Sequence, residues 1–224
     1  MSLWLRLNFY YSNFMNKDFP NKIPVFPLSG VIYFPNTSLP LNIFEKRYLD
    51  LVEDCMKNDK FMGMVQSVKG DEQLYDVGCL GKIENFKKTQ DGRVLVTLSG
   101  LSRFEIINEI SNSKLYREFE VKYKKFDSDL ITNAGDNINT KEMQVLFEKA
   151  KIFFRKSGLL LNWKELERLP HNQQIDTLAM ISPVSNEEKQ KLLETITPLS
   201  KIKILSEIIE FYLLGDNYDN YTIQ

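Results

Sequence analysis

The chain has 224 residues, of which 43% are hydrophobic and 26% charged, values typical of a folded globular protein rather than a disordered one. A chain of this length buries roughly 70% of the surface that its unfolded form exposes, so it needs no disulfide or metal to fold. Its 29 basic and 30 acidic residues leave a net charge of -1. This balance argues against a nucleic-acid partner, since binding to phosphate backbones usually requires a strong basic excess.

The chain contains two cysteines, Cys55 and Cys79, and a single histidine, His171. The usual zinc sites need four Cys or His ligands at short spacings, so we expect no metal site. Both thiols are expected to be buried and reduced, which indicates a cytoplasmic protein. No segment reaches the ~20 consecutive apolar residues of a membrane helix, and residues 1–14 lack the features of a signal peptide. We therefore expect no membrane partner.

Residues 1–22 form an N-terminal extension without clear periodicity. Two interpretations stay open for it. Translation starts at Met15, which would make residues 1–14 an artefact, or the segment is a short amphipathic arm that packs on the body.

Residues 23–127 carry the signals of strands and turns. Because each proline forces the preceding residue out of the helical region, segments 23–28 and 39–43 are predicted to be extended. The prolines are expected to confine these strands to edges or bulges. Between these strands and the next, apolar residues recur with a helical period, which predicts one helix ending near Asn58. Its buried face is expected to comprise Tyr48, Leu51, Val52, Cys55 and Met56.

Short runs of apolar or alternating residues then predict further strands, at 61–66, 78–86, 94–98, 103–107 and 118–123. Thr89 to Gly92 is predicted to be a hairpin turn, because Asp-Gly tolerates the positive φ of tight hairpins. Ser99-Gly100 is predicted to be a second turn, and residues 67–76 a polar connection. About six short strands and one helix indicate a small barrel or folded sheet.

Residues 128–138 have the composition of a linker, and residues 139–215 are predicted to be an α-helical bundle, followed by a polar tail at 216–224. Capping boxes are expected at Asn139 with Glu142 and at Ser185 with Glu188. Thr197-Pro198 is expected to open the last helix, with Leu199 facing inward and Gly215 as its end. The predicted fold class is therefore α+β.

Motifs that carry chemistry are missing from the sequence. Gly81-Lys82 is followed by Ile83, so it is not a phosphate-binding P-loop, and no GxGxxG or GxSxG occurs. We expect both cysteines and His171 to be structural residues. The sequence predicts no catalytic residue, no cofactor and no enzymatic activity.

Residues 23 to 104 carry motifs in a specific order and spacing. They are IPVFPL at 23–28, VIYFP at 31–35, LPLNIFE at 39–45, MGMVQ at 62–66, YDVGC at 75–79, DGR at 91–93 and LSGLSRF at 98–104. This series resembles the N-terminal substrate-binding domain of the Lon protease family. The FEKRY version at 44–48 and the segment LAMISP at 178–183 are similar to bacterial stand-alone Lon-domain proteins.

The resemblance implies a PUA-like β-domain followed by a helical bundle. In full-length Lon proteases this module precedes an ATPase and a serine–lysine peptidase, but this sequence has neither a P-loop nor a Pro-Ser-Ala-Gly nucleophile segment. The resemblance thus implies binding of unfolded or apolar polypeptides without cleavage. Because the ATPase and peptidase segments are missing, the resemblance suggests that a partner protease or chaperone receives the bound chains. The fold leaves a second function open, a small-ligand or RNA-binding module.

We expect two groups of residues to bind polypeptide. Tyr33, Phe34 and Pro35 are large apolar residues beside a turn, where they either face solvent or plug the end of the barrel. Glu45, Lys46 and Arg47 at the start of the first helix are the polar candidates. Their alternative role is local, with Glu45 favouring the helix dipole and Arg47 pairing with a neighbour.

Overall fold

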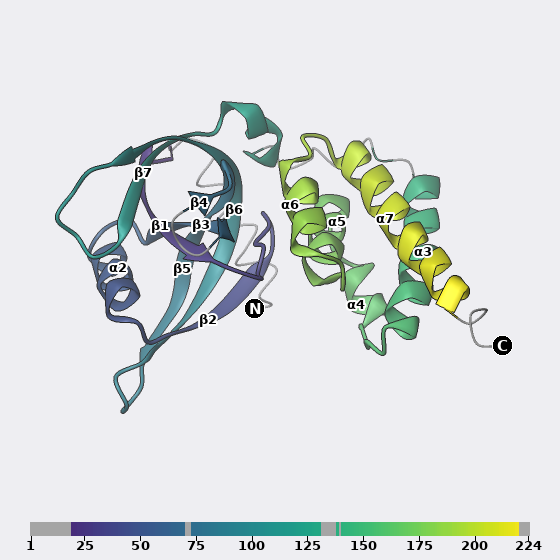
Figure 1. Cartoon of the computed structure of the whole chain (residues 1–224), viewed down its shortest axis with the longest axis horizontal. Helices are drawn as coiled ribbons and strands as arrows, with labels where there is room; N and C mark the ends of the chain where they lie inside the picture. The colour runs from purple at the N-terminus through teal and green to yellow at the C-terminus, as the bar shows by residue number, and fades with distance from the viewer. Residues whose placement is uncertain (1–18, 70–72, 131–137, 139, 220–224) are drawn as a thin grey trace.

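The computed structural model describes residues 19–69, 73–130, 138 and 140–219 of the chain. A β-domain from the N-terminal half lies beside a bundle of helices from the C-terminal half (Figure 1). Helix α6 (Asn186–Glu194) is on the side of the bundle that faces the β-domain, and α3 (Thr140–Lys156) and α7 (Pro198–Asp219) lie farther away. This arrangement confirms the predicted α+β class.

The β-domain is a sheet that closes on itself. Its order is β1-β7-β6-β5-β3, and β1 also pairs with β3, while β2 pairs with the first part of β6 and β4 with the end of β3. The strands are β1 (Lys22–Leu28), β2 (Ser38–Ile43), β3 (Phe61–Lys69), β4 (Gln73–Leu74), β5 (Val77–Lys88), β6 (Val94–Ile110) and β7 (Arg117–Lys122).

Strand β1 contains two prolines although it lies inside the closed sheet. Its first half, up to Val25, pairs antiparallel with β7, and its second half, from Val25 on, pairs parallel with β3. Pro24 and Pro27 therefore each lie where β1 has one partner strand, so a missing N–H on the other side is tolerated. Each proline thus lies in a part of β1 that has one unpaired side, which agrees with the expected restriction of proline to strand edges.

The predicted turn at Ser99-Gly100 is wrong, because both residues lie within the 17-residue strand β6. A Cβ on Gly100 would lie 2.3 Å from the carbonyl oxygen of Phe34. The pairing of β5 with β6 also shifts register here, between Leu80 and Gly81. Glycine at this position permits the close approach of two backbones rather than a change of direction.

The predicted hairpin at Thr89 to Gly92 is confirmed, with Gly92 at φ 84°. The connection expected at 67–76 is shorter than predicted, because β3 continues to Lys69 and β4 pairs back on it. Helix α2 (Lys46–Lys57) is the one helix predicted for this region. It buries Tyr48, Leu51, Val52 and Cys55 as expected, whereas Met56 is only partly buried.

The bundle follows the 3-10 helix η1 (Lys124–Leu130) and contains five α-helices among the described residues. These α-helices are α3, α4 (Trp163–Leu166), α5 (His171–Ile181), α6 and α7. The capping box of Ser185 with Glu188 is confirmed, and the backbone N–H of Ser200 donates to Oγ1 of Thr197 as expected of a cap, at 3.1 Å. The cap predicted at Asn139 lies outside the described residues.

Three further expectations for the C-terminal half need correction. Helix α7 passes Gly215 and reaches Asp219, so this glycine is not its end, and Leu199 is exposed rather than inward. Residues 128–130 belong to η1 instead of a linker. The rest of the expected linker, 131–137, and the N-terminal segment 1–18 lie outside the described residues, as does the tail from 220.

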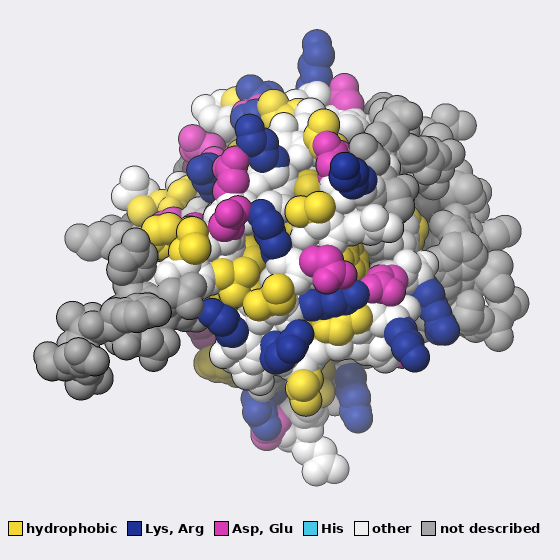
Figure 2. Space-filling model, turned by 90° about the vertical axis from the view of Figure 1, so that its right-hand side faces the viewer, with side chains coloured by type: hydrophobic (Ala, Val, Ile, Leu, Met, Phe, Trp, Pro, Cys, Tyr) yellow, Lys and Arg dark blue, Asp and Glu magenta, His cyan; other side chains and the backbone are white. Residues whose placement is uncertain are grey.

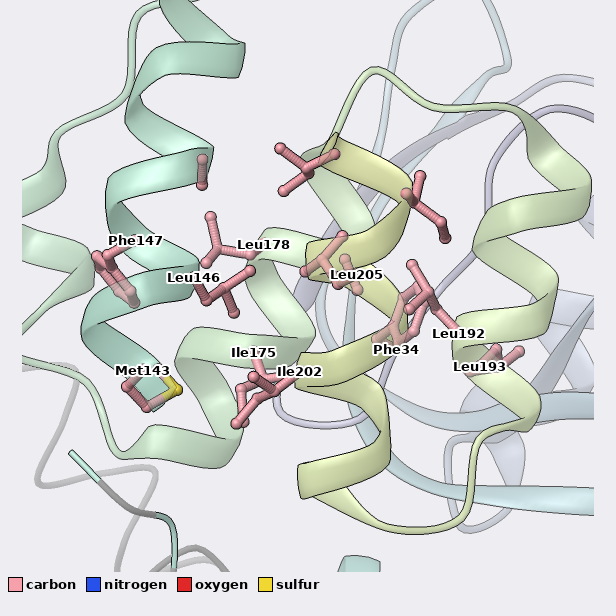
Figure 3. Close-up of a cluster of buried hydrophobic side chains, with 14 of the residues drawn as sticks. Phe34, Met143, Leu146, Phe147, Ile175, Leu178, Leu192, Leu193, Ile202 and Leu205 are labelled. Carbon is pink, nitrogen blue, oxygen red and sulfur yellow. The ribbon is translucent and has the colours of Figure 1, made fainter. Parts of the chain in front are cut away.

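The largest cluster of buried apolar side chains is shared by the two halves. It joins α3, α5, α6 and α7 to six residues from outside those helices, Ile32, Phe34, Val77, Phe126, Ile138 and Leu166. Figure 3 shows Phe34 among Leu192 and Leu193 of α6 and Ile202 and Leu205 of α7. The β-domain and the bundle are thus packed through one continuous core.

Candidate functional site

The first group of candidate residues is buried. Phe34 is completely enclosed in the bundle core, and Tyr33 and Pro35 are buried as well. The expectation that these residues face solvent is therefore wrong. The alternative, a loop that acts as a plug, describes their position, but the loop fills the bundle as well as closing the β-domain (Figure 3).

The loop that carries these residues is fixed by hydrogen bonds. The hydroxyl of Thr37 donates to the carbonyl oxygen of Phe34 at 2.6 Å, and the backbone N–H of Asn36 donates to Gly100 at 3.1 Å. Asn36 has a φ of 58°, a left-handed conformation that asparagine tolerates better than most residues. The plug is therefore a defined structure rather than an adaptable surface.

Two buried ion pairs lie between the β-domain and the helices that follow it. In the first pair, Nζ of Lys201 in α7 donates to Oδ1 of Asp176 in α5, and it lies 5.4 Å from the ring centre of Phe34. The other oxygen of Asp176 accepts a hydrogen bond from the side chain of Asn36 at 3.5 Å. These contacts link the loop of the β-domain to two helices of the bundle.

The second pair joins Arg103 of β6 to Asp129 of η1, with Nη2 and Oδ1 2.7 Å apart. Arg103 also donates to the carbonyl oxygens of Leu193, Thr195 and Ile196, at the end of α6. A cation at this position satisfies carbonyl groups that the helix leaves unpaired. Burial lowers the pKa of Arg103, but the hydrogen bond and charge of Asp129 outweigh it, so the net pKa is raised.

The second group of candidates lies at the start of α2, where Glu45 and Lys46 are exposed and Arg47 is half-buried. Glu45 is the N-cap residue, and its carboxylate accepts two hydrogen bonds from Arg47, at 3.0 and 2.9 Å. The Arg47 guanidinium also lies 4.4 Å from the ring centre of Tyr48. Lys46 pairs with Asp50 one turn later, at 2.6 Å, and this hydrogen bond raises the pKa of Lys46. Arg47 thus pairs with a neighbour, as the local alternative expected.

An apolar residue that the site prediction missed lies directly before these charges. Phe44 follows β2 and is 66% exposed. On the outer face of the same ladder, Leu95 of β6 is paired with Asn42 and is 41% exposed, while Ile43 and Val94 are buried. For Leu95, the sequence carried a signal of exposure. Leu95 alternates with Val94 and Val96, and successive strand residues face opposite sides of the sheet. We call Phe44, Leu95 and residues 45–47 the α2 surface.

Backbone pairing at the free edge of β2 is limited. Gly100 donates to Thr37 at 2.9 Å, and this register directs the backbone groups of Leu39 and Leu41 toward β6. Pro40 then lies on the open edge, where it offers a carbonyl but no N–H. Proline on an edge strand prevents continuous pairing with another strand. The α2 surface therefore offers side-chain contacts rather than a template for a new strand.

Cysteine, histidine and carboxylate side chains do not form a metal-binding cluster in the described part of the chain. No group of three or more His, Cys, Asp or Glu residues that could hold a metal ion occurs in it. Burial raises the pKa of the Cys55 thiol to about 12, and it also raises that of Cys79 well above the ordinary value. Both thiols are free and buried, as predicted. His171 is the first residue of α5, close to the position expected.

Lysines gather at two places in the sequence, at 87–88 and at 122–125, and three of them pair with carboxylates. Lys122 and Lys125 both contact Glu105, at 3.5 and 2.9 Å, and Lys88 pairs with Glu53 of α2. Their positive charge is therefore compensated on the surface itself.

Among the described helices, none is long and apolar enough to cross a membrane.

Comparison with protein families finds one match that covers most of the chain. The family described as ATP-dependent protease La (LON) substrate-binding domain matches residues 22–210. Similar proteins include Lon protease 2 of Myxococcus xanthus, 23% identical over 86% of this chain and 24% of that protein. A Lon protease of Buchnera aphidicola subsp. Schizaphis graminum is 28% identical over 84% of this chain and 25% of its own length. The chain spans about a quarter of the length of these relatives.

Two solved structures share the fold. The Lon N-terminal domain protein from Xanthomonas campestris has a TM-score of 0.62 and 23% identity, covering 82% of this chain and 96% of that one. The N-terminal domain of the Mycobacterium avium complex Lon protease also has a TM-score of 0.62, with 16% identity, covering 84% of this chain and 98% of that one. Both halves of the molecule are therefore part of one recurring arrangement.

Proposed function

The chain belongs to the family of Lon substrate-binding domains, and on that premise we propose that it binds unfolded or apolar polypeptide segments without cleaving them. The observation that carries the proposal is the exposure of Phe44 beside the charged start of α2. An aromatic side chain that faces solvent next to an arginine is typical of the residues that dominate protein-binding surfaces.

The chemistry of the α2 surface favours a broad range of apolar ligands over a highly charged ligand. Glu45 pairs with Arg47 and Lys46 pairs with Asp50, so these four charges cancel within one helical turn. Binding is then dominated by burial of Phe44 and Leu95, while the ion pairs supply hydrogen bonds at the rim. Such a surface suits apolar segments that many unfolded chains expose.

We infer that the protein acts as a holder and passes its ligand to a protease or chaperone. The chain corresponds to about a quarter of its protease relatives, over the region of their substrate-binding domain. The lack of a P-loop and of a serine–lysine peptidase motif supports binding without turnover. Purified protein is expected to hydrolyse neither ATP nor casein. Turnover that a single substitution in this chain abolishes would contradict the non-catalytic role.

Binding is tested with a fluorescent, reduced and carboxymethylated protein as a permanently unfolded ligand. Fluorescence anisotropy measures its dissociation constant with the wild type and with Phe44→Ser. We expect about tenfold weaker binding, because truncating a central aromatic side chain typically costs more than 1 kcal/mol. Raising the salt concentration is expected to change the affinity little, since the contact is mainly apolar. A steep loss with salt would instead indicate binding to a polyanion.

The matched control is Phe211→Ser in α7. Phe211 is 71% exposed, so the two variants remove the same side chain from two different surfaces. The control is expected to bind the unfolded protein as the wild type does. Equal affinity of the Phe44 variant and the wild type, or an equal loss in both variants, would overturn the assignment of the α2 surface.

A further inference from the structure

The connection between α3 and α4 carries an apolar corner that is exposed among the described residues. Leu160 has a relative exposure of 103%, the largest of any large hydrophobic residue among those described, and Leu159 beside it is 41% exposed. Leu161, by contrast, packs against the bundle core. Exposed loop tips usually carry small or polar residues. Leu160 at such a tip needs a reason other than folding, because its side chain is fully exposed.

The corner is held in place by both helix ends. Gly158, with a φ of 70°, donates to Arg155 at 3.1 Å, and Leu159 donates to Phe154 at 2.9 Å, the two bonds of a Schellman motif. Three residues later, the side chain of Asn162 caps α4. Leu160 therefore projects from a defined turn and has no freedom to fold back onto the body.

Basic residues surround this corner in the sequence. Residues 151–168 contain five basic and two acidic side chains, a net charge of +3 in a chain whose total is -1. Lys151 pairs with Glu167 at 3.1 Å. In the described part of the structure, Arg155, Lys164 and Arg168 are exposed and have no ion-pair partner. Figure 2 shows dark blue side chains among yellow and magenta ones on the face of the molecule that lies on the right in Figure 1.

We propose that this region, which we call the Leu160 corner (residues 155–168), binds the surface of a membrane that contains anionic lipids. Exposed leucines enter the boundary between headgroups and acyl chains, and the three unpaired cations attract the negative surface. The shape favours a lipid surface over a protein, since a projecting tip fits a soft interface, whereas a protein would need a matching recess. The sequence led us to expect no membrane partner, but that expectation addressed spanning segments rather than surface binding.

The test is flotation of the 224-residue protein with two kinds of vesicle. One consists of phosphatidylcholine alone, and the other contains about one third phosphatidylglycerol. We expect the protein to float with the anionic vesicles only, and binding to fall steeply as salt is raised, because surface attraction is screened within a Debye length. The double variant Leu159→Ser/Leu160→Ser and the variant Arg155→Gln/Lys164→Gln/Arg168→Gln are each expected to reduce the bound fraction about tenfold.

Two controls isolate the corner. Leu199→Ser removes another exposed leucine, 51% exposed at the start of α7, and should float as the wild type does. Phe44→Ser should also float normally, which keeps this proposal separate from the polypeptide-binding function. Circular dichroism verifies that every variant is folded. Absence of flotation by the wild type, equal binding to neutral vesicles, or unchanged binding by both corner variants would overturn the proposal. Self-association that Leu160→Ser abolishes, without flotation, would do so as well and indicate a protein contact.

Discussion

Two phenylalanines ten residues apart in the sequence have opposite environments. Phe34 is fully enclosed and Phe44 is 66% exposed, although both follow extended, proline-containing segments. The difference arises because helices formed more than 150 residues later cover Phe34, and no local pattern reports such a contact. Phe44 lies just outside the ladder of β2 with β6, where the chain turns into α2. A side chain's role here depends on what the distant chain brings to it.

Gly100 lets the backbone of β6 lie against the carbonyl group of Phe34, so replacing this glycine should lower the stability of the fold. In Gly100→Ala the new methyl group would meet the carbonyl oxygen of Phe34 at 2.3 Å, so the backbone must shift. We expect the free energy of unfolding to fall by about 2–4 kcal/mol, measured by urea denaturation. Gly215→Ala is the control, since nothing lies within 4 Å of a Cβ there and α7 continues past it. That variant should be neutral or up to about 1 kcal/mol more stable. Equal stability of both variants would contradict the steric argument.

At the scale of elements, the loop between β1 and β2 contributes more to the bundle than to its own domain. Ile32 and Phe34 belong to the cluster formed by α3, α5, α6 and α7, whereas Tyr33 belongs to the cluster of the barrel. Alternate residues of one short loop therefore fill two different cores. The buried pair of Lys201 and Asp176 holds this loop in place. Asp176 accepts a hydrogen bond from Asn36, and Nζ of Lys201 lies over the ring of Phe34.

Phe34→Ala is expected to lower the free energy of unfolding by about 3–5 kcal/mol, because it leaves a cavity in a closely packed core. Phe211→Ala removes the same atoms from an exposed position and should change stability by less than about 0.5 kcal/mol. Thermal or urea unfolding of the two variants beside the wild type measures the difference. A cost for Phe34→Ala no larger than that of the control would mean that the loop is not part of the core.

Short sequence patterns predicted most helices and strands, because the residues that form each pattern lie close together in the sequence. The alternation in β6, the helical stripe of α2 and the Ser185 cap each carried enough information on their own. Prediction failed where glycine had two interpretations. Gly100 was taken as a turn although it permits a long-range approach, and Gly215 was taken as a helix end although α7 tolerates it. Of the residues that we propose to bind polypeptide, the sequence analysis named Glu45, Lys46 and Arg47 but not the neighbouring Phe44, and the binding role of all four stays a prediction.

The whole molecule is joined by contacts that neither half can satisfy alone. Arg103 from the barrel binds Asp129 and the last carbonyls of α6, and Gln190 of α6 donates to the carbonyl oxygen of Val77 at 3.1 Å. Removing one member of a buried ion pair leaves an uncompensated charge, which typically costs about 3–5 kcal/mol. The two halves are therefore expected to behave as one cooperative unit.

This cooperativity is testable with two probes that report on different halves. Both cysteines are buried in the barrel, and burial raises the pKa of the Cys55 thiol to about 12, so neither should react with a thiol reagent while the barrel is folded. Most helical residues belong to the bundle, which dominates far-UV circular dichroism. We expect thiol exposure and loss of helical signal to follow the same urea curve. Separate midpoints for the two probes would contradict a single unit.

The insertion of Phe34 into the bundle also limits how this gene can be cut or recombined. A fragment ending after η1 would leave Ile32, Phe34 and Val77 facing water, while a fragment starting at α3 would have a hole where the ring should be. Swapping the C-terminal half for that of a distant homologue would demand a matching recess for the ring. Boundaries drawn by composition at such a junction therefore make poor sites for truncation or chimaeras.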